Sequence, residues 1–507
     1  MKATNLSVLI LIALGTWPAT AEIRLPNVIS DHAVLQRNRP VHVWGWATPG
    51  AALTAHFHQQ TVKTQTNQVG EWSLYLNPEP AGGPYTLSLT GDGPEKDVSD
   101  LLVGDVWLAS GQSNMEMPLR GFPPTAFVKD AAKEIAAAMN PRLRLLLVAH
   151  KSSDSPVNDV NDGWTTCTPE TAKDFSAVAY FFGREIAAKE GVPIGLIDST
   201  WGGTPADSWT SMNTFGSDPR LLPAFAARAE FADQQANLSA TIAAEKRGDA
   251  QAKAAGKPVP AHPWHPDEVS WSPAGLYNGM IAPLTPMTIK GIIWYQGETN
   301  SAPDRARAYS SLFTAMIGDW RMHFAQGNLP FLYVQISSFS SPAEDWGLVR
   351  DGERRGLRVA NTAMAVSLDR GDAGNVHLAD KQTIGTRLAL AARGLVYGEA
   401  VPYRGPTFRE VTTEPNGTGK LSLRVWFDHA QGLTLRNQGD SGFEVAGPDH
   451  HFVPAQAVVE ADTVVVSVPA VDRPKYVRYG WMGVVPGFIY NAAGLPAPTF
   501  TSESEPL

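Results

Sequence analysis

The sequence is poor in cysteine, in basic clusters and in long apolar segments, and each scarcity excludes a class of protein. Cys167 is the only cysteine among 507 residues, so no internal disulfide can form and thiol chemistry is disfavoured. Lysine and arginine total 41 against 50 aspartate and glutamate, a net charge of −9, and no run of basic residues occurs. We therefore expect no nucleic-acid partner. Nothing in the sequence indicates an obligatory protein partner.

The amino-terminal segment has the pattern of a signal peptide. Lys2 precedes the apolar run Val8 to Leu14, and Ala19 and Ala21 form a small-x-small cleavage pattern. This predicts a signal peptide over residues 1–21, with no cysteine directly after it for lipid attachment. No later apolar stretch approaches the ~20 residues of a membrane span. We expect an exported protein, periplasmic or secreted, with no membrane partner.

The rhythm of apolar residues divides the remaining chain into three regions. Residues 22–100 contain short alternating runs such as VHVWGWA and GEWSLYL, which predict an antiparallel β-domain. Residues 101–400 alternate apolar strands with helical stretches, which predicts an α/β fold with a parallel sheet and helices on both faces. Strand alternation returns over residues 401–507 and predicts a second β-domain.

An Ala-rich, charged stretch interrupts the α/β region and predicts an exposed helical insertion at about 212–270. His262 and His265 follow the helical part, at 220–257. Neither has a cysteine or a carboxylate at a recognisable ligand spacing, so we interpret this segment as a Pro-stiffened loop. No metal site and no cofactor are predicted.

The segment LVGDVWLASGQSNMEMP contains a strand, a tight turn and a serine. The run Val103 to Ala109 predicts a buried strand, Gly111 allows a sharp turn, and Ser113 falls where a helix begins. Two interpretations follow. Ser113 is a helix-capping residue, or it is a nucleophile exposed at a sheet edge beside backbone N–H groups.

Other strand ends supply the partners that a nucleophilic serine needs. His377 follows the predicted strand Ala363 to Leu368 and precedes an amphipathic helix, so we expect it at the same sheet edge as a general base. Oxyanion donors are expected from two further loops after strands: the backbone N–H groups of Gly202 and Gly203, and the side-chain amide of Gln296 or Asn300.

Four motifs, GQSNMEM, WGGTPADSW, IIWYQGETN and NVHLADKQTIGTRLA, occur in this order. With them, the chain resembles the sialate-O-acetylesterase-type carbohydrate esterases of the SGNH hydrolase superfamily over nearly all of its mature length. The resemblance implies a flavodoxin-like SGNH domain between two β-domains. It also implies hydrolysis of acetyl esters on saccharides without a metal or cofactor. By motif, Ser113 is the nucleophile, His377 the base, and Gly203 and Gln296 hold the oxyanion.

The match to the family motif ends at the acid that orients the histidine. The family places an aspartate three or two residues before the histidine, positions occupied here by Gly374 and Asn375. Asp372 is the first candidate for this acid and Asp369 the second, whereas Asp380 is expected to cap the following helix. A serine–histidine dyad without an acid is the alternative.

The motifs indicate ester chemistry but leave the sugar open. Acetylated plant oligosaccharides such as xyloglucan and 9-O-acetylated sialic acid are both candidates, with Arg350 as a residue for a sialate carboxylate. The tryptophans expected either to stack on sugar rings or to pack in the core are Trp201, Trp209, Trp264, Trp271 and Trp346. The alternative functions are a noncatalytic carbohydrate-binding protein and a lipase or arylesterase.

Overall fold

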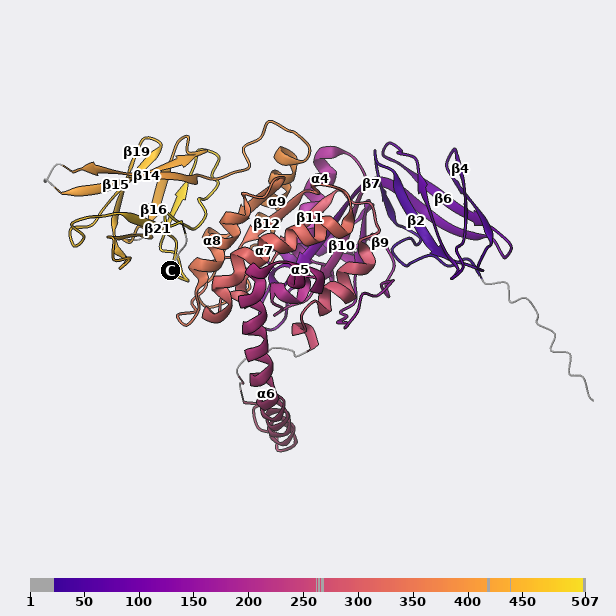
Figure 1. Ribbon diagram of the computed structural model, residues 1–507, viewed down its shortest axis with the longest axis horizontal. Helices are drawn as coiled ribbons and strands as arrows, with labels where there is room; N and C mark the ends of the chain where they lie inside the picture. The colour runs from indigo at the N-terminus through magenta and orange to yellow at the C-terminus, as the bar shows by residue number, and fades with distance from the viewer. Residues whose placement is uncertain are drawn as a thin grey trace, which may run out of the picture.

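The computed structural model describes residues 22–260, 262, 265, 269–416, 420–437 and 439–504, so the predicted signal peptide lies outside the described residues. Three regions follow one another along the long axis of the molecule (Figure 1): a β-domain, a central α/β domain and a second β-domain. This arrangement confirms the predicted α/β fold with β-rich regions on both sides.

The amino-terminal domain is built from two layers of mainly antiparallel strands. One pair, β2 with β5, packs on the group β4-β3-β6, which continues through β7 to β1. Every second side chain of β2 and β5 is buried, as expected for strands with one face on a core. The strands are β1 (Val34–Gln36), β2 (Val41–Trp46), β3 (Ala52–Phe57), β4 (Gln60–Gln65), β5 (Glu71–Leu76) and β6 (Gly82–Thr90).

A single long strand, β7 (Lys96–Gly111), belongs to both the first and the central domain. Its first half pairs with β6 and β1, and its second half lies between two strands of the central sheet. The boundary predicted between residues 100 and 101 therefore falls inside one strand. Buried Asp105 strengthens this junction, because its carboxylate accepts hydrogen bonds from Arg37 Nη2 at 2.8 Å and Gln36 Nε2 at 2.9 Å.

The central sheet has the strand order β13-β12-β11-β7-β10-β8-β9, with only β9 antiparallel to its neighbour. Five of these strands, in the order β10-β7-β11-β12-β13, form a flavodoxin-like, doubly wound sheet whose switch point lies at β7. The loops that leave β7, β10 and β11 therefore meet at one edge. The strands are β8 (Asn140–Leu147), β9 (Thr165–Cys167), β10 (Ile194–Thr200), β11 (Gly291–Tyr295), β12 (Phe331–Gln335) and β13 (Thr362–Val366).

Helices cover both faces of this sheet, with α4 packed on α9 and α7 packed on α8. The predicted cap at Asp380 is confirmed, because its Oδ1 accepts the Thr383 N–H at the start of α9. In α4, the Ser176 side chain caps the first turn and Gly191 ends the helix at φ 64°. The helices are α1 (Ser113–Glu116), α2 (Ala131–Ala136), α3 (Pro169–Ala172), α4 (Ala177–Glu190), α5 (Met212–Ser217), α6 (Leu222–Ala254), α7 (Pro303–Phe324), α8 (Trp346–Gly356) and α9 (Lys381–Leu395).

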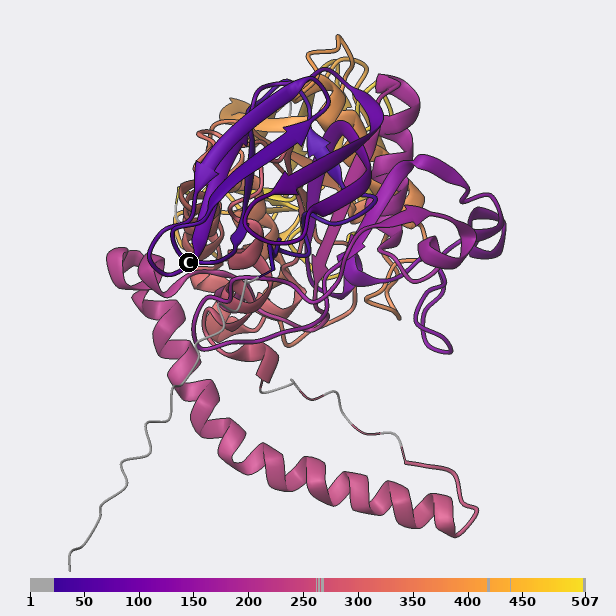
Figure 2. The same cartoon turned by 90° about the vertical axis from the view of Figure 1, so that its right-hand side faces the viewer.

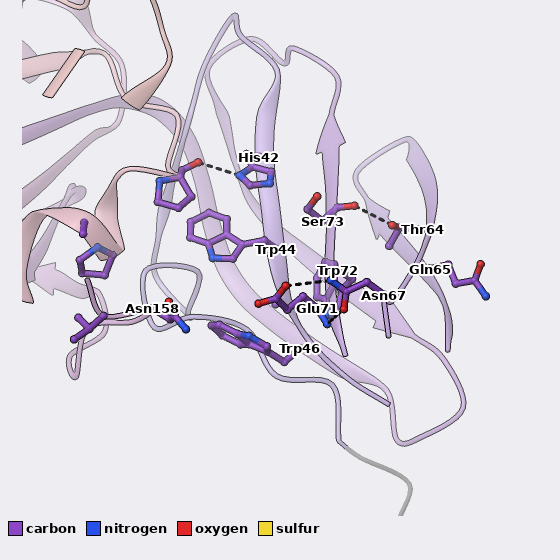
Figure 3. Close-up of a pocket in the computed structure, with 15 residues that line it drawn as sticks. His42, Trp44, Trp46, Thr64, Gln65, Asn67, Glu71, Trp72, Ser73 and Asn158 are labelled. Carbon is purple, nitrogen blue, oxygen red and sulfur yellow. Dashed lines mark hydrogen bonds between the residues drawn. The ribbon is translucent and has the colours of Figure 1, made fainter. Parts of the chain in front are cut away.

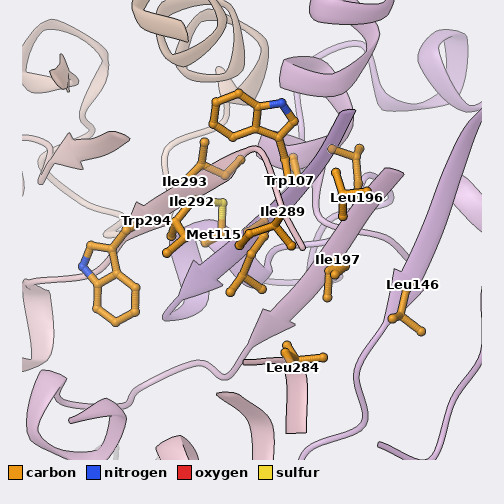
Figure 4. Packing of buried hydrophobic residues seen from close by; sticks show 14 of the residues in the cluster. Trp107, Met115, Leu146, Leu196, Ile197, Leu284, Ile289, Ile292, Ile293 and Trp294 are labelled. Atoms are coloured by element: carbon orange, nitrogen blue, oxygen red, sulfur yellow. The ribbon is translucent and has the colours of Figure 1, made fainter. Parts of the chain in front are cut away.

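The core of the central domain lies between these layers. Figure 4 shows Trp107 of β7, Leu196 of β10 and Ile292 of β11 packed among other apolar side chains. Trp209, one of the candidate sugar-stacking residues, is fully buried and meets the ring of Trp294 edge-on at 6.1 Å. Trp209 is therefore a core residue, the second of its two predicted roles.

The stretch predicted as a helical insertion contains α6, a helix of 33 residues that projects from the body of the molecule (Figures 1 and 2). The returning chain contacts it through His262, whose Nε2 lies 2.7 Å from Asp249, and through His265, whose Nε2 lies 3.0 Å from Glu245. These carboxylates sit on the helix, so the linear spacing of the histidines did not reveal them. Trp264 lies outside the described residues.

The carboxyl-terminal domain has its own apolar core and two four-stranded sheets, β14-β15-β20-β19 and β18-β17-β21-β23, with the pair β16-β22. The strands are β14 (Thr407–Pro415), β15 (Leu421–Asp428), β16 (Thr434–Asn437), β17 (Phe443–Ala446), β18 (Val453–Pro454), β19 (Gln456–Glu460), β20 (Thr463–Ser467), β21 (Tyr476–Tyr479), β22 (Gly487–Tyr490) and β23 (Phe500–Thr501). Among the described residues, no helix combines the length and apolarity needed to cross a bilayer.

Arg350 of α8 joins this domain to the central one. Its side chain is 0 % exposed, and all five of its N–H groups donate to main-chain carbonyls on both sides of the junction. The acceptors are those of Ile336, Ser337, Gly480, Met482 and Gly483. Arg350 is thus a structural residue, and its suggested role in binding a sialate carboxylate is wrong because no donor remains for a ligand.

Candidate active site

A pocket of about 490 Å³ opens at the edge of the sheet where β7, β10 and β11 end. Ser113, Gly203 and His377, three of the predicted site residues, line it together. The remaining lining residues are Gln112, Glu116, Phe122, Gly202, Trp271, Glu298, Thr299, Arg305, Phe339, Glu344, Trp346 and Val376. The loops that sequence analysis placed at one sheet edge therefore do converge.

Ser113 is the first residue of the short helix α1, directly after the turn that ends β7. The helix N-cap is Gln112, which makes no side-chain capping bond, so the interpretation of Ser113 as a capping residue is wrong. Gly111 makes the turn at φ 134°, and a Cβ atom there would lie 2.1 Å from the carbonyl oxygen of Tyr295. Only glycine fits this position, and the turn it forms presents Ser113 to the pocket.

The loop after β10 approaches the serine closely. A Cβ atom on Gly202 would lie 3.2 Å from the Cβ atom of Ser113 and 2.7 Å from Glu116 Oε2. Gly203 has φ 70°, and its carbonyl accepts a 2.6 Å hydrogen bond from Trp271 Nε1. Within the described part of the chain the Gly203 N–H donates to no other group, so it is available to a ligand oxygen.

His377 lies in the loop between β13 and α9, with Phe122 edge-on to its ring at 5.5 Å. Burial, together with the nearby charge of Lys381, lowers the pKa of His377 to about 4. The imidazole is therefore neutral above that pH and able to accept a proton. Its ring makes no hydrogen bond to any described carboxylate.

Beneath the serine, three buried polar side chains form a network that sequence analysis missed. Asn114 Nδ2 donates to Glu298 Oε1 at 2.6 Å, and Lys381 Nζ donates to Asn114 Oδ1 at 2.5 Å. Burial lowers the pKa of Lys381 to about 7 and raises the pKa of Glu298. The network fixes α1 against the loops that follow β11 and β13, and so positions Ser113.

Glu116 is a second residue that sequence analysis missed. It lies one helical turn after Ser113, lines the pocket, and its Oε1 is 3.0 Å from His150 Nε2. His150 stacks on Trp201 with ring centroids 4.3 Å apart. Its position three residues after the serine, on the same helix face, was the available signal.

Four of the candidate site residues do not line the pocket in the described structure: Gln296, Asn300, Asp372 and Asp369. Gln296 is buried behind it, where its Nε2 donates to Asn300 Oδ1 at 2.6 Å and to the Thr204 carbonyl at 3.2 Å. Asp372 is exposed, and its Oδ1 accepts the Gly374 N–H at 2.8 Å. The second acid candidate, Asp369, is held by Arg387 in a bidentate pair.

The pocket wall carries aromatic rings and one arginine. Trp271 and Trp346 line it but are each only 2% exposed, so both pack in the wall of the pocket and present little ring surface for a sugar to stack on. Arg305 lies over the Trp271 ring at 4.8 Å, and its Nε has no hydrogen-bond partner among the described residues. In the same part of the chain, no group of three or more His, Cys, Asp or Glu side chains is arranged to hold a metal ion.

Comparison with known proteins identifies the family to which this chain belongs. The family profile described as carbohydrate esterase, sialic acid-specific acetylesterase matches residues 256–393. The sialate O-acetylesterase of Pongo abelii is 32% identical over 88% of this chain and 84% of its own length. The chain belongs to the sialate O-acetylesterase family. Mouse sialate O-acetylesterase is 29% identical over 98% of this chain and 97% of its own length.

A solved member of this wider group of carbohydrate esterases shares the whole architecture. The carbohydrate acetylesterase XAC1771 from Xanthomonas citri superposes with a TM-score of 0.80 at 34% identity, covering 95% of this chain and 100% of its own. The predicted resemblance is therefore confirmed, and the chain is a carbohydrate O-acetylesterase. The alternative of a purely noncatalytic binding protein is wrong.

Proposed function

We propose that this family member removes acetyl groups from saccharides through an acetyl-serine intermediate. Ser113 Oγ attacks the acetyl carbonyl while His377 takes its proton, and the sugar hydroxyl leaves with that proton. Water, activated by His377, then attacks the acetyl-serine and releases acetate. The N–H of Gly203 and that of Ser113 stabilise the negative charge on the carbonyl oxygen.

The observation that carries this proposal is the convergence of three loops on one pocket. Ser113, Gly203 and the neutral imidazole of His377 arrive from the ends of β7, β10 and β13. Gln296 was proposed from sequence as a further oxyanion donor. Its side-chain amide is hydrogen-bonded to the Thr204 carbonyl instead. We therefore assign Gln296 to supporting the loop after β10 rather than to holding the oxyanion.

The test is a pair of serine variants on the same strand and turn. Ser113→Ala is expected to lower the rate of acetate release by about 10³-fold or more without changing the melting temperature. Ser110→Ala is the matched control, because Ser110 lies on the same strand, is buried outside the pocket lining, and its hydroxyl has no partner among the described residues. Acetate release by Ser113→Ala at a tenth of the wild-type rate would show that another group attacks the ester.

We propose that Ser113 and His377 act as a dyad, and that Asp372 does not orient the histidine. Asp372 remains the first candidate from sequence, yet its carboxylate is exposed and bonded to Gly374. We expect Asp372→Asn to retain kcat within about tenfold, whereas loss of a true triad acid costs roughly 10⁴-fold. A loss of that larger size, with an unchanged melting temperature, would restore Asp372 as the orienting acid.

We propose a neutral acetylated oligosaccharide, such as acetylated xyloglucan, as the preferred substrate over 9-O-acetylated sialic acid. Three carboxyl side chains line the pocket, Glu116, Glu298 and Glu344, against the single guanidinium of Arg305. A sialate carboxylate would meet this acidic wall. Acetate release from xyloglucan oligosaccharides, xylan and 9-O-acetylated sialic acid, followed by mass spectrometry, ranks the substrates directly.

The same assay separates a carbohydrate esterase from a lipase or arylesterase. We expect p-nitrophenyl acetate to be hydrolysed and p-nitrophenyl octanoate to be left intact. Export is proposed from the signal-peptide pattern at residues 1–21. Amino-terminal sequencing of the protein recovered outside the cytoplasm should then begin at Glu22.

A further inference from the structure

A second cavity, of about 580 Å³, lies between the amino-terminal β-domain and the central domain, apart from the catalytic pocket. One wall is formed by β2, β4 and β5, and the other by Val157, Asn158 and the segment containing Ala282, Pro283 and Pro286. We call this cavity the tryptophan groove. Figure 3 shows Trp44 and Trp46 projecting from β2 into it, with Asn158 on the central-domain side.

Three aromatic side chains form a continuous strip on one face of β2. His42, Trp44 and Trp46 alternate with the buried residues Val41, Val43 and Gly45, so they share the face that is turned away from the domain core. At ~3.3 Å per residue the strip is about 13 Å long, which accommodates more than one sugar ring. Aromatic rings in such a row give a sugar chain a continuous apolar surface to contact.

Neighbouring groups hold these rings rigid before any ligand arrives. The Arg24 guanidinium covers one side of Trp46 at 4.6 Å. Trp44 stacks on His42 at 5.0 Å, and His42 stacks in turn on Tyr75 at 4.8 Å. A platform fixed in this way loses little side-chain entropy on binding.

Polar side chains surround the strip with hydrogen-bonding groups that are themselves anchored. Asn67 Oδ1 accepts the N–H groups of Val69 and Glu71, and Thr64 Oγ1 donates to the Ser73 carbonyl at 2.9 Å. The other uncharged polar lining residues are Gln65, Ser73 and Asn158. Amides and hydroxyls beside aromatic rings are the pattern of a site that recognises sugar hydroxyls.

The charges of the residues that line the groove favour some classes of ligand over others. Burial lowers the pKa of His42, so its imidazole is neutral at pH 7, and Glu71 is the one carboxylate in the lining. With no cationic side chain in that lining, phosphates, nucleic acids and uronic acids lack a partner. A neutral chain is favoured.

We propose that the tryptophan groove is a noncatalytic binding site for neutral oligosaccharide chains. It tethers a polysaccharide to the enzyme while the pocket of Ser113 removes acetyl groups. This site does not depend on the serine mechanism, because binding in the groove requires no ester.

The test measures binding of unacetylated xyloglucan oligosaccharides and cellohexaose to full-length Ser113→Ala by isothermal titration calorimetry. We expect Trp44→Ala and Trp46→Ala to weaken the affinity at least tenfold, and Trp46→Phe, which keeps a ring, to retain most of it. Trp426→Ala is the matched control, since Trp426 is a half-buried tryptophan on a strand of the other β-domain. Melting temperatures confirm that each variant is folded.

Activity provides the second readout. In the active enzyme, with Ser113 intact, Trp44→Ala and Trp46→Ala should leave kcat/KM for p-nitrophenyl acetate unchanged. Both substitutions should raise KM on acetylated xyloglucan polymer. Equal affinity of wild-type and tryptophan variants, or no binding to any neutral oligosaccharide, would overturn the proposal. So would self-association in sedimentation experiments that is lost in Trp46→Ala, because the groove would then hold a second copy of the chain.

Discussion

His377 owes its chemistry to its surroundings rather than to a partner carboxylate. Burial disfavours its protonated form, the charge of Lys381 opposes it further, and Glu116 acts in the opposite direction. A histidine with an ordinary pKa would lose its basic form below about pH 6.5. Here the imidazole stays neutral down to about pH 4, so the proposed base remains able to accept a proton under mildly acidic conditions.

This predicts the acid limb of the pH profile. Activity requires neutral His377, so kcat/KM for p-nitrophenyl acetate should rise with pH through about 4 and be level above it. Lys381→Met removes a positive charge, raises the pKa of His377, and should move the acid limb to higher pH. Glu116→Gln should move it to lower pH.

Stopped-time assays after brief exposure to each pH separate this effect from unfolding. An acid limb near pH 6.5 in the wild-type enzyme would contradict the lowered pKa. Equal shifts in both variants would show that neither charge acts on the histidine.

Residue type and loop position were enough to predict candidate residues that line the pocket, whereas residues defined by their contacts were missed. Ser113 and His377 were found because each follows a strand of one sheet. Lys381 and Glu298 were not, since they meet through Asn114 only after loops far apart in sequence converge. For Trp209 and Arg350, sequence suggested sugar-binding roles that the structure does not support. Both side chains are buried, and no sequence motif encodes burial.

Among the elements, the loop after β10 fits closely against the proposed nucleophile, Ser113. Gly202→Ala would place a methyl group 3.2 Å from the Cβ atom of Ser113 and 2.7 Å from Glu116 Oε2. We expect kcat/KM to fall by roughly 10²-fold, because a small misplacement of reacting groups has a large effect on rate. The melting temperature should change little, since Glu116 can move.

Gly216→Ala in α5 is the matched control, because a Cβ atom there meets nothing within 4 Å. Alanine at an exposed helical position is expected to stabilise the protein by about 0.5–1 kcal/mol and to leave kcat/KM unchanged. Wild-type kcat/KM in Gly202→Ala would show that this loop does not need to approach the serine.

Element types were predictable where local signals are strong. Ser176, Gly191 and Asp380 mark helix ends, and they do so in the structure. The length of β7 was not predictable, because DVSD at residues 97–100 resembles a linker when neighbours are ignored. Pairing with β1 and β6 makes those residues part of a strand, a tertiary effect that local propensity does not contain.

At the scale of the whole molecule, Arg350 connects the central and carboxyl-terminal domains. Arg350→Met leaves five buried or partly buried carbonyls without their donor, which should lower the free energy of unfolding by roughly 3 kcal/mol or more. Urea unfolding followed by tryptophan fluorescence measures the loss. Arg409→Met, at an arginine whose side chain is 47% exposed, is the control and should change stability by less than about 0.5 kcal/mol. Equal stability of the two variants would show that the junction does not depend on the guanidinium.

The shared strand β7 also sets an order of events during synthesis. The amino-terminal domain lacks one strand of its sheet until residues 96–104 have left the ribosome or the export channel. The same strand then waits for β10 and β11, which arrive roughly 90 and 190 residues later. Folding of the first domain therefore leaves both edges of the second half of β7 unpaired until the middle of the chain has emerged, and unpaired strand edges favour aggregation.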